Sequence, residues 1–185
     1  MCGRADATRG PHSLAGPDWS SGVTQTTRIS HTAHFAMLNR VIFLSQPRAE
    51  AMRPPRDTAL ISITDTARPP AALREGWSEV LRLSFDDIDP VTYPDDGFDE
   101  EYAAMREIHA YQLVELAEFC RSAFARNRRL VVHCRYGQSR SAGVAKAICE
   151  AMDLPFPAWY ADHNTFVYRT VLGALRHALA RDRTP

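Results

Sequence analysis

The sequence predicts an α/β fold with a mainly parallel central sheet flanked by helices. Short runs rich in β-branched or aromatic residues are bounded by Pro, Asp and Gly, as strands usually are. Longer segments between the later runs have helical periodicity, and strands that alternate with helices favour parallel pairing. The chain has 185 residues, 45% of them hydrophobic, which is enough for one domain with its own core.

Four segments have the composition of strands. They are residues 40–45, 58–64, 80–85 and 129–133. The last of them, RLVVH, is almost continuously apolar, which is typical of a central strand covered on both faces.

Three segments are predicted to be helices. Residues 100–126 are the clearest, because one face of a 3.6-residue helix collects their apolar side chains. These side chains are Tyr102, Met105, Leu113, Leu116, Cys120 and Ala123. His109 falls within this stripe, where we expect a core or boundary residue. Residues 142–152 are apolar on most sides and predict a buried helix, and a last helix is expected over 164–180 with Asn164 as its N-cap.

The beginning of the chain differs from the rest. Residues 1–36 are rich in Gly, Ser, Thr and Pro without a sustained period, which predicts a flexible leader before a domain spanning 37–185. No apolar run approaches the ~20 residues of a membrane helix, and the start lacks the apolar core of a secretory signal. We therefore expect a soluble, cytoplasmic protein without a membrane partner.

Charge and cysteine content exclude several classes of site. Arg and Lys total 22, Asp and Glu total 22, and Lys146 is the only lysine, so no basic patch for nucleic acid is expected. The four cysteines show neither C-x-x-C spacing nor metal-ligand spacing with His, which argues against a zinc site or a disulfide framework. They are Cys2, Cys120, Cys134 and Cys149. We expect Cys120 and Cys149 to act as small buried hydrophobes.

The segment LVVHCRYGQSRSAG, residues 130–143, concentrates chemically active residues between a predicted strand and a predicted helix. In parallel α/β sheets, ligands bind beyond the carboxyl ends of strands, where helix N-termini attract anions. Gly137 allows the loop to curl, and inward-facing amides would form a nest for a tetrahedral anion. Arg140 would complete it with a planar, bidentate guanidinium. The predicted substrate-binding residues are Arg135, Tyr136, Gly137, Gln138 and Ser139.

The same loop predicts a nucleophile. A helix N-terminus and a nearby cation favour ionised cysteine, so we expect the Cys134 thiolate to attack a bound phosphorus. The Ser141 hydroxyl could donate a hydrogen bond to that sulfur and help it to leave again. His133 is expected to fix the loop backbone through its imidazole.

The run H-C-R-Y-G-Q-S-R-S, residues 133–141, resembles the H-C-x-x-G-x-x-R-S signature of cysteine-dependent protein tyrosine phosphatases. It is most similar to the dual-specificity branch and its small bacterial relatives. The resemblance implies a phosphatase that works through a cysteinyl-phosphate intermediate without metal or cofactor. It also implies a general acid, an Asp on a loop that follows an earlier strand.

The run LRLSFDDIDP offers Asp86, Asp87 and Asp89 for this role. Side chains alternate across a strand, so Asp87 continues the face of Leu83 and Phe85 while Asp86 points to the other face. The family pattern, with a buried residue two before the acid, also favours Asp87, and Asp86 ranks second. The acid would lie 47 positions before Cys134, farther than is usual in the family, because an inserted segment follows it. That segment holds further candidates, namely Asp95, Asp96 and Asp99, although Asp99 also suits a helix N-cap.

Three functions compete on these features. The first is hydrolysis of a phosphomonoester, on a phosphorylated protein or a small molecule. Arg135 resembles the dual-specificity pattern, whereas the absence of lysine from the loop disfavours phosphoinositides. The second is a rhodanese-type sulfurtransferase, whose loop commonly has one residue fewer before the Arg. The third is a non-catalytic phosphopeptide-binding module, which would not need a nucleophile.

Overall fold

The computed structural model describes residues 40–90 and 107–181. Within these residues, four strands form one sheet in the order β1-β4-β2-β3, and every neighbouring pair is parallel. The strands are β1 (Val41–Ser45), β2 (Thr58–Thr64), β3 (Glu79–Ser84) and β4 (Arg129–Cys134). The predicted α/β class and the mainly parallel sheet are therefore confirmed, and each predicted strand agrees with the observed one to within a residue at either end.

The two central strands, β2 and β4, are buried on both faces of the sheet, and their side chains alternate between the two faces. On β2, Ala59, Ile61 and Ile63 enter the larger core, whereas Leu60 enters a smaller core on the opposite face. On β4, Leu130 and Val132 likewise enter the larger core and Val131 the smaller one. The continuous apolar run of β4 therefore reflects its central position, as the sequence predicts.

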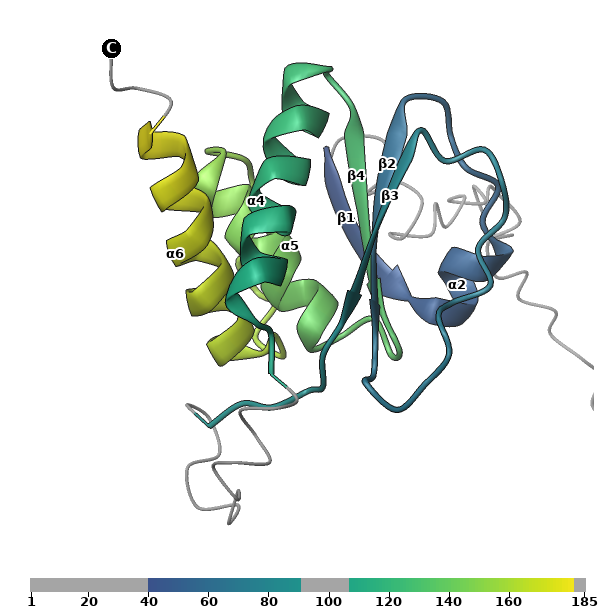
Figure 1. Cartoon of the computed structure of the whole chain (residues 1–185), viewed down its shortest axis with the longest axis horizontal. Helices are drawn as coiled ribbons and strands as arrows, with labels where there is room; N and C mark the ends of the chain where they lie inside the picture. Colours follow the sequence, from purple (N-terminus) through teal and green to yellow (C-terminus); the bar gives the residue numbers. More distant parts are fainter. Residues whose placement is uncertain (1–39, 91–106, 182–185) are drawn as a thin grey trace, which may run out of the picture.

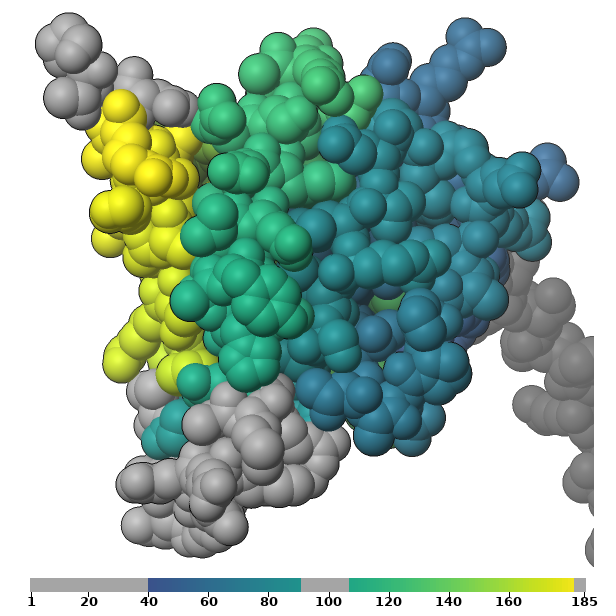
Figure 2. Space-filling view, in the orientation of Figure 1, coloured from purple at the N-terminus to yellow at the C-terminus, as the bar shows by residue number. Residues whose placement is uncertain are grey.

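Helices cover both faces of the sheet (Figure 1). On one face lie α4 (Ala110–Ala125), α5 (Arg140–Ala151) and α6 (Thr165–Arg181). On the other lies α2 (Gln46–Ala51), whose buried Ala49 joins the smaller core. The space-filling view shows α4 and α6 on one flank of the molecule and the teal segment between β2 and β3 on the other (Figure 2).

Two helices differ from the sequence prediction. Helix α4 begins at Ala110 instead of 100, because residues 107–109 are not helical and the His109 amide donates to Gln112 Oε1 at 2.9 Å. His109 is thus an N-cap and not part of the apolar stripe, while Tyr102 and Met105 lie outside the described residues. Helix α2 was not predicted, since six residues with a Pro in the first turn show no helical period.

The remaining helices match their predictions. Helix α5 begins two residues before the predicted 142, and α6 spans 165–181 against a predicted 164–180. Cys120 and Cys149 are buried, as predicted. The proposed leader, residues 1–36, lies outside the described residues.

The parallel arrangement brings the carboxyl ends of all four strands to one edge, the lower edge in Figure 1. Ser45, at the end of β1, pairs in register with Cys134, at the end of β4. Asp65 directly follows β2, and the segment from Phe85 to Asp89 follows β3. Residues far apart in the sequence therefore meet beside the loop that joins β4 to α5.

Candidate active site

The loop from Cys134 to Arg140 joins the last residue of β4 to the first residue of α5. Gly137 has a φ of +75°, which disfavours any residue with a Cβ. A Cβ on Gly137 would also lie 2.3 Å from the Ser45 nitrogen and 2.4 Å from the Leu44 carbonyl carbon. The Gln46 amide donates to the Arg135 carbonyl at 3.3 Å. The loop thus rests directly on the end of β1, and glycine is needed there both for conformation and for space.

Cys134 lies at the base of this loop and is only 2% exposed. Its Sγ is 3.2 Å from the Oγ of Ser141, which is also buried. The other two described thiols lie in α4 and α5, and burial raises the pKa of Cys120 to about 12 and that of Cys149 to about 11. Of the described cysteines, Cys134 alone is placed at a helix N-terminus beside an arginine.

Arg140 is buried, and its guanidinium is held from outside the loop. Nη1 donates to the Phe85 carbonyl at 2.6 Å, and Nη2 pairs with Asp65 Oδ1 at 2.6 Å. Nε is buried without a hydrogen-bond acceptor among the described residues, and it lies 3.9 Å from Asp87 Oδ2. The protein thereby holds Nη1 and Nη2 of the guanidinium in place and leaves Nε as a buried donor without a partner among the described residues.

Asp65 was not predicted as a site residue. Its carboxylate lies among three arginines, with Arg68 Nε at 3.2 Å and Arg135 Nη1 at 3.8 Å in addition to Arg140. Its position directly after a central strand is a signal that could have identified it, because the carboxyl ends of parallel strands share one edge. Asp65 gives the site a fixed negative charge on the outer side of Arg140.

Asp87 reaches the loop, as the strand alternation predicts. Its Oδ1 accepts from Ser139 Oγ at 2.6 Å and from Asn164 Nδ2 at 2.9 Å. Asp86 points elsewhere and accepts from the amide of Thr66 at 2.8 Å. The structure thus brings Asp87, and not Asp86, to the residues of the loop. The alternatives in the inserted segment, Asp95, Asp96 and Asp99, lie outside the described residues.

His133 is fully buried, and burial lowers its pKa to about 4, although the Cys134 backbone opposes part of the shift. The imidazole is therefore neutral near pH 7. Its Nε2 lies 2.8 Å from Ser62 Oγ on β2, while Nδ1 has no hydrogen-bond partner among the described residues. The imidazole thus contacts the neighbouring strand β2 through Ser62 and also interacts with the backbone of Cys134, the first residue of the loop.

The remaining loop side chains border the site. Tyr136 is 66% exposed, and the Arg135 guanidinium lies over its ring at 5.0 Å. The Tyr160 hydroxyl donates to the Gln138 carbonyl at 2.9 Å. Burial, followed by the charges of Asp162 and Cys134, raises the pKa of Tyr160. Tyr160 therefore belongs to the surroundings of the loop, a position that sequence periodicity does not reveal.

Asn164 caps α6 as predicted, since its Oδ1 accepts from the Val167 amide at 2.8 Å. Its contact with Asp87 was not predicted. Asp89, the third carboxylate that the run LRLSFDDIDP offers, accepts from the Thr165 amide at 2.7 Å. The start of α6 is thereby attached to the segment that carries Asp87.

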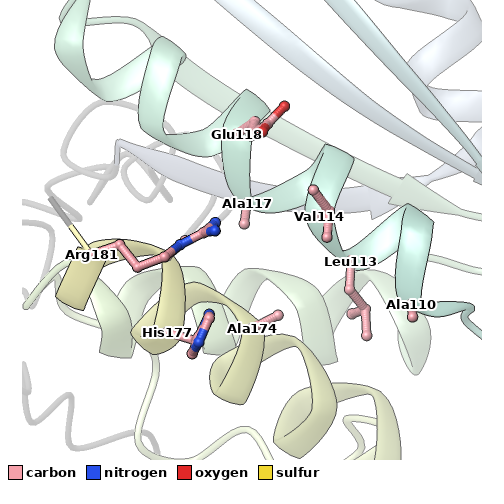
Figure 3. A pocket seen from close by; sticks show the side chains of 9 residues that line it. Ala110, Leu113, Val114, Ala117, Glu118, Ala174, His177 and Arg181 are labelled. Atoms are coloured by element: carbon pink, nitrogen blue, oxygen red, sulfur yellow. The ribbon is translucent and has the colours of Figure 1, made fainter.

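A separate shallow groove of about 220 Å³ lies between α4 and α6 (Figure 3). Most of its lining is apolar, with Leu113, Val114 and four alanines, and Glu118, His177 and Arg181 also border it. It contains no thiol and no residue from the loop. Cys134 and the paired charges of Asp65 and Arg140 are instead at the carboxyl edge of the sheet.

No family model matches the chain, and no curated protein matches it. Among residues 40–90 and 107–181, no helix has the length and apolarity needed to cross a membrane. In the same residues, no three His, Cys, Asp or Glu side chains form a group able to hold a metal ion. The functional assignment therefore rests on the geometry of the loop and its neighbours.

Proposed function

We propose that this protein is a phosphomonoester hydrolase that acts through a cysteinyl-phosphate intermediate on Cys134. The observation that carries the proposal is the convergence of a thiol, a buried guanidinium and a carboxylate on one strand-to-helix loop. Cys134 and Arg140 frame the loop, and Asp87 accepts a hydrogen bond from Ser139 within it. Nucleophilic catalysis of phosphoryl transfer needs these three groups together.

In the first half-reaction, the Cys134 sulfur attacks phosphorus, an S–P bond forms and the bond from phosphorus to the leaving oxygen breaks. The leaving oxygen takes a proton from the Asp87 carboxyl group, so the product is a neutral alcohol or phenol. Positioned general acids typically contribute about 10²–10⁴-fold to such a step. Asp87 is suited to it because it is attached to the loop that would hold the phosphoryl group.

In the second half-reaction, water attacks the phosphocysteine and transfers a proton to the Asp87 carboxylate. The S–P bond breaks, and the sulfur leaves as a thiolate while inorganic phosphate is released. Ser141 Oγ, 3.2 Å from the sulfur, can donate a hydrogen bond to the departing thiolate. This contact lowers the cost of forming a buried sulfur anion.

Arg140 would stabilise the charge on the phosphoryl oxygens in both steps. Its Nη1 and Nη2 atoms are already bonded to Phe85 and Asp65, so the guanidinium cannot rotate freely. The buried Nε has no hydrogen-bond acceptor among the described residues and is available to the anion. Preorganised donors of this kind stabilise a transition state without reorganising during the reaction.

Within this class, we propose a protein tyrosine or dual-specificity phosphatase. The resemblance of residues 133–141 to that family supports it. The loop side chains Arg135 and Tyr136 also support it, because the Tyr136 ring is exposed and the Arg135 guanidinium lies over it. A phosphorylated protein is the proposed substrate, and small aryl phosphates should serve as assay substrates.

The test is turnover of p-nitrophenyl phosphate in buffer containing EDTA, comparing wild type with Cys134→Ser and Cys149→Ala. Cys149 is a buried thiol in α5 outside the site, so its variant controls for loss of a cysteine. We expect Cys134→Ser to lose more than about a thousandfold in kcat, while Cys149→Ala keeps its activity. Full activity in Cys134→Ser would overturn the proposal.

Thiocyanate formation from thiosulfate and cyanide, without phosphate release, would support a sulfurtransferase instead. Phosphopeptide binding with neither reaction would support a binding module.

A further inference from the structure

The first residues of α6 bind the segment that carries Asp87. Asp89 accepts hydrogen bonds from the amides of Thr165 and Phe166, at 2.7 and 3.3 Å. The Ile88 carbonyl accepts from Asn164 Nδ2 at 2.9 Å. Ile88, Asp89 and Asn164 are buried at this junction, and Asn164 is only 2% exposed. The carboxylate of Asp87 is therefore placed by a helix remote in sequence, and not by its own loop alone.

Both the oxygen and the nitrogen of the Asn164 side-chain amide are hydrogen-bonded. Its Oδ1 accepts from the Val167 amide at 2.8 Å, and Nδ2 donates both to Asp87 Oδ1 and to the Ile88 carbonyl. A buried amide with both groups satisfied has one favourable orientation, because reversing it would face donors with donors and acceptors with acceptors. Nδ2 must therefore point at Asp87.

Asn164 is also connected to the loop itself. Its backbone amide donates to the Ser139 carbonyl at 3.2 Å, and Ser139 Oγ donates to Asp87 Oδ1 at 2.6 Å. A Cβ on Gly143 would lie 2.8 Å from the Asn164 carbonyl oxygen, so α5 approaches this point closely. The loop, the segment after β3 and α6 thus meet at one residue.

These contacts make the two oxygens of Asp87 different. Oδ1 is occupied by two donors, Ser139 and Asn164, whereas Oδ2 lies toward Arg140, 3.9 Å from its Nε. We propose that Asn164 is a positioning residue that, with Ser139, anchors Oδ1 so that Oδ2 faces the leaving group and exchanges the catalytic proton. This inference rests on the proposed phosphatase function and adds to it the residue that sets the direction of proton transfer.

A positioning role predicts a specific kinetic pattern. Loss of acid catalysis slows substrates with basic leaving groups, which need a proton, more than substrates with acidic leaving groups, which depart as anions. Asn164→Ser retains an oxygen that can cap α6 but removes the donor to Asp87. We expect its kcat for phenyl phosphate to fall about 10-fold to 100-fold. For a fluorinated umbelliferyl phosphate, which has an acidic leaving group, kcat should change less than about threefold.

Two controls separate positioning from folding. Val171→Ala removes part of a fully buried side chain of α6, seven positions after Asn164. It should loosen the helix without changing the ratio of the two rates. In the Asp87→Asn background, Asn164→Ser should have no further effect on that ratio, because the group it positions is already gone. Should Asn164→Ser not fold, Asn164→Thr also retains a capping oxygen and lacks the amide donor to Asp87, and the same change in ratio is expected.

The possible outcomes distinguish the inference from the proposed function. Equal loss on both substrates in the Asn164 variants, with a changed ratio in Asp87→Asn, would overturn the positioning role and leave the phosphatase intact. An unchanged ratio in Asp87→Asn would refute both the acid and its positioning. Full activity of Cys134→Ser would instead refute the phosphatase function itself.

Discussion

Asp65 Oδ1 lies 2.6 Å from Arg140 Nη2 and links the end of β2 to the first residue of α5. The guanidinium of Arg140 is almost fully buried, so the link operates with little screening by water. Together with the Phe85 carbonyl, Asp65 sets the plane of the guanidinium before any anion arrives. In the proposed mechanism, Asp65 therefore matters as much as the residues of the loop.

Replacement of Asp65 by Asn should lower kcat for p-nitrophenyl phosphate by roughly tenfold. The amide keeps the shape but replaces an ion pair by a hydrogen bond from the guanidinium to an uncharged acceptor, which is weaker, and Arg140 gains freedom to rotate. Steady-state kinetics with inorganic phosphate as inhibitor checks this. The inhibition constant of phosphate should stay the same or fall, because Asn removes a negative charge near the bound anion. An unchanged kcat would show that Asp65 does not orient Arg140.

The assignment of the acid is tested by comparing Asp87→Asn with Asp86→Asn. Asp87 contacts Ser139 of the loop, whereas Asp86 contacts Thr66. We expect Asp87→Asn to lower kcat for phenyl phosphate by about a hundredfold or more, and Asp86→Asn to change it less than about threefold. The reverse order would move the acid to Asp86. Nearly full activity in both variants would move it to the inserted segment.

The fold was predictable to the extent that it depends on local patterns. All four strands follow from short β-branched runs, and their parallel pairing from the alternation with helices. The start of α4 was placed ten residues too early because apolar spacing alone does not show where a helix begins, which here is set by the pairing of His109 with Gln112. Helix α2 escaped detection because six residues are too few to show a period.

The candidate site was predictable where it is contiguous. Residues 133–141 carry their chemistry in one run, and strand alternation then selects Asp87 over Asp86. Asp65 and Asn164 were not found as partners because their roles depend on which strand ends and helix starts are neighbours. Asp87 and Asn164 are 77 positions apart, and the order of strands in the sheet cannot be obtained from the periodicity of each strand.

Gly137→Ala should destabilise the protein by at least about 3 kcal/mol, from a left-handed backbone conformation and a backbone clash. The added Cβ would meet Ser45 and Leu44 at less than 2.5 Å. The matched control is Gly173→Ala in α6, where a Cβ meets nothing within 4 Å and should stabilise the helix by about 0.5–1 kcal/mol. Urea unfolding measures both. Equal stability of the two variants would contradict the close seating of the loop on β1.

His133 predicts a dependence of stability on pH. Burial lowers its pKa from 6.5 to about 4, so the unfolded chain binds the proton more readily than the folded one. The associated stability is present above the unfolded value and is lost as pH falls from about 6.5 toward 4. Between pH 7 and 5 the loss amounts to about 2 kcal/mol. Unfolding of wild type and His133→Gln at both pH values isolates this contribution, and identical pH slopes would refute it.

The proposed mechanism requires a covalent bond between Cys134 and phosphorus during turnover. The most direct test is to denature the protein while it hydrolyses p-nitrophenyl phosphate, digest it, and measure the mass of the peptide containing residue 134 by mass spectrometry. Ser141→Ala should increase the trapped fraction, because it removes the hydroxyl 3.2 Å from the sulfur that assists its departure. We predict that a fraction of the wild-type peptide carries one phosphoryl group on Cys134. This fraction should be larger in Ser141→Ala, and no adduct should form in Cys134→Ser. Sustained turnover with no adduct on that peptide, or with the phosphoryl group on another residue, would contradict the account.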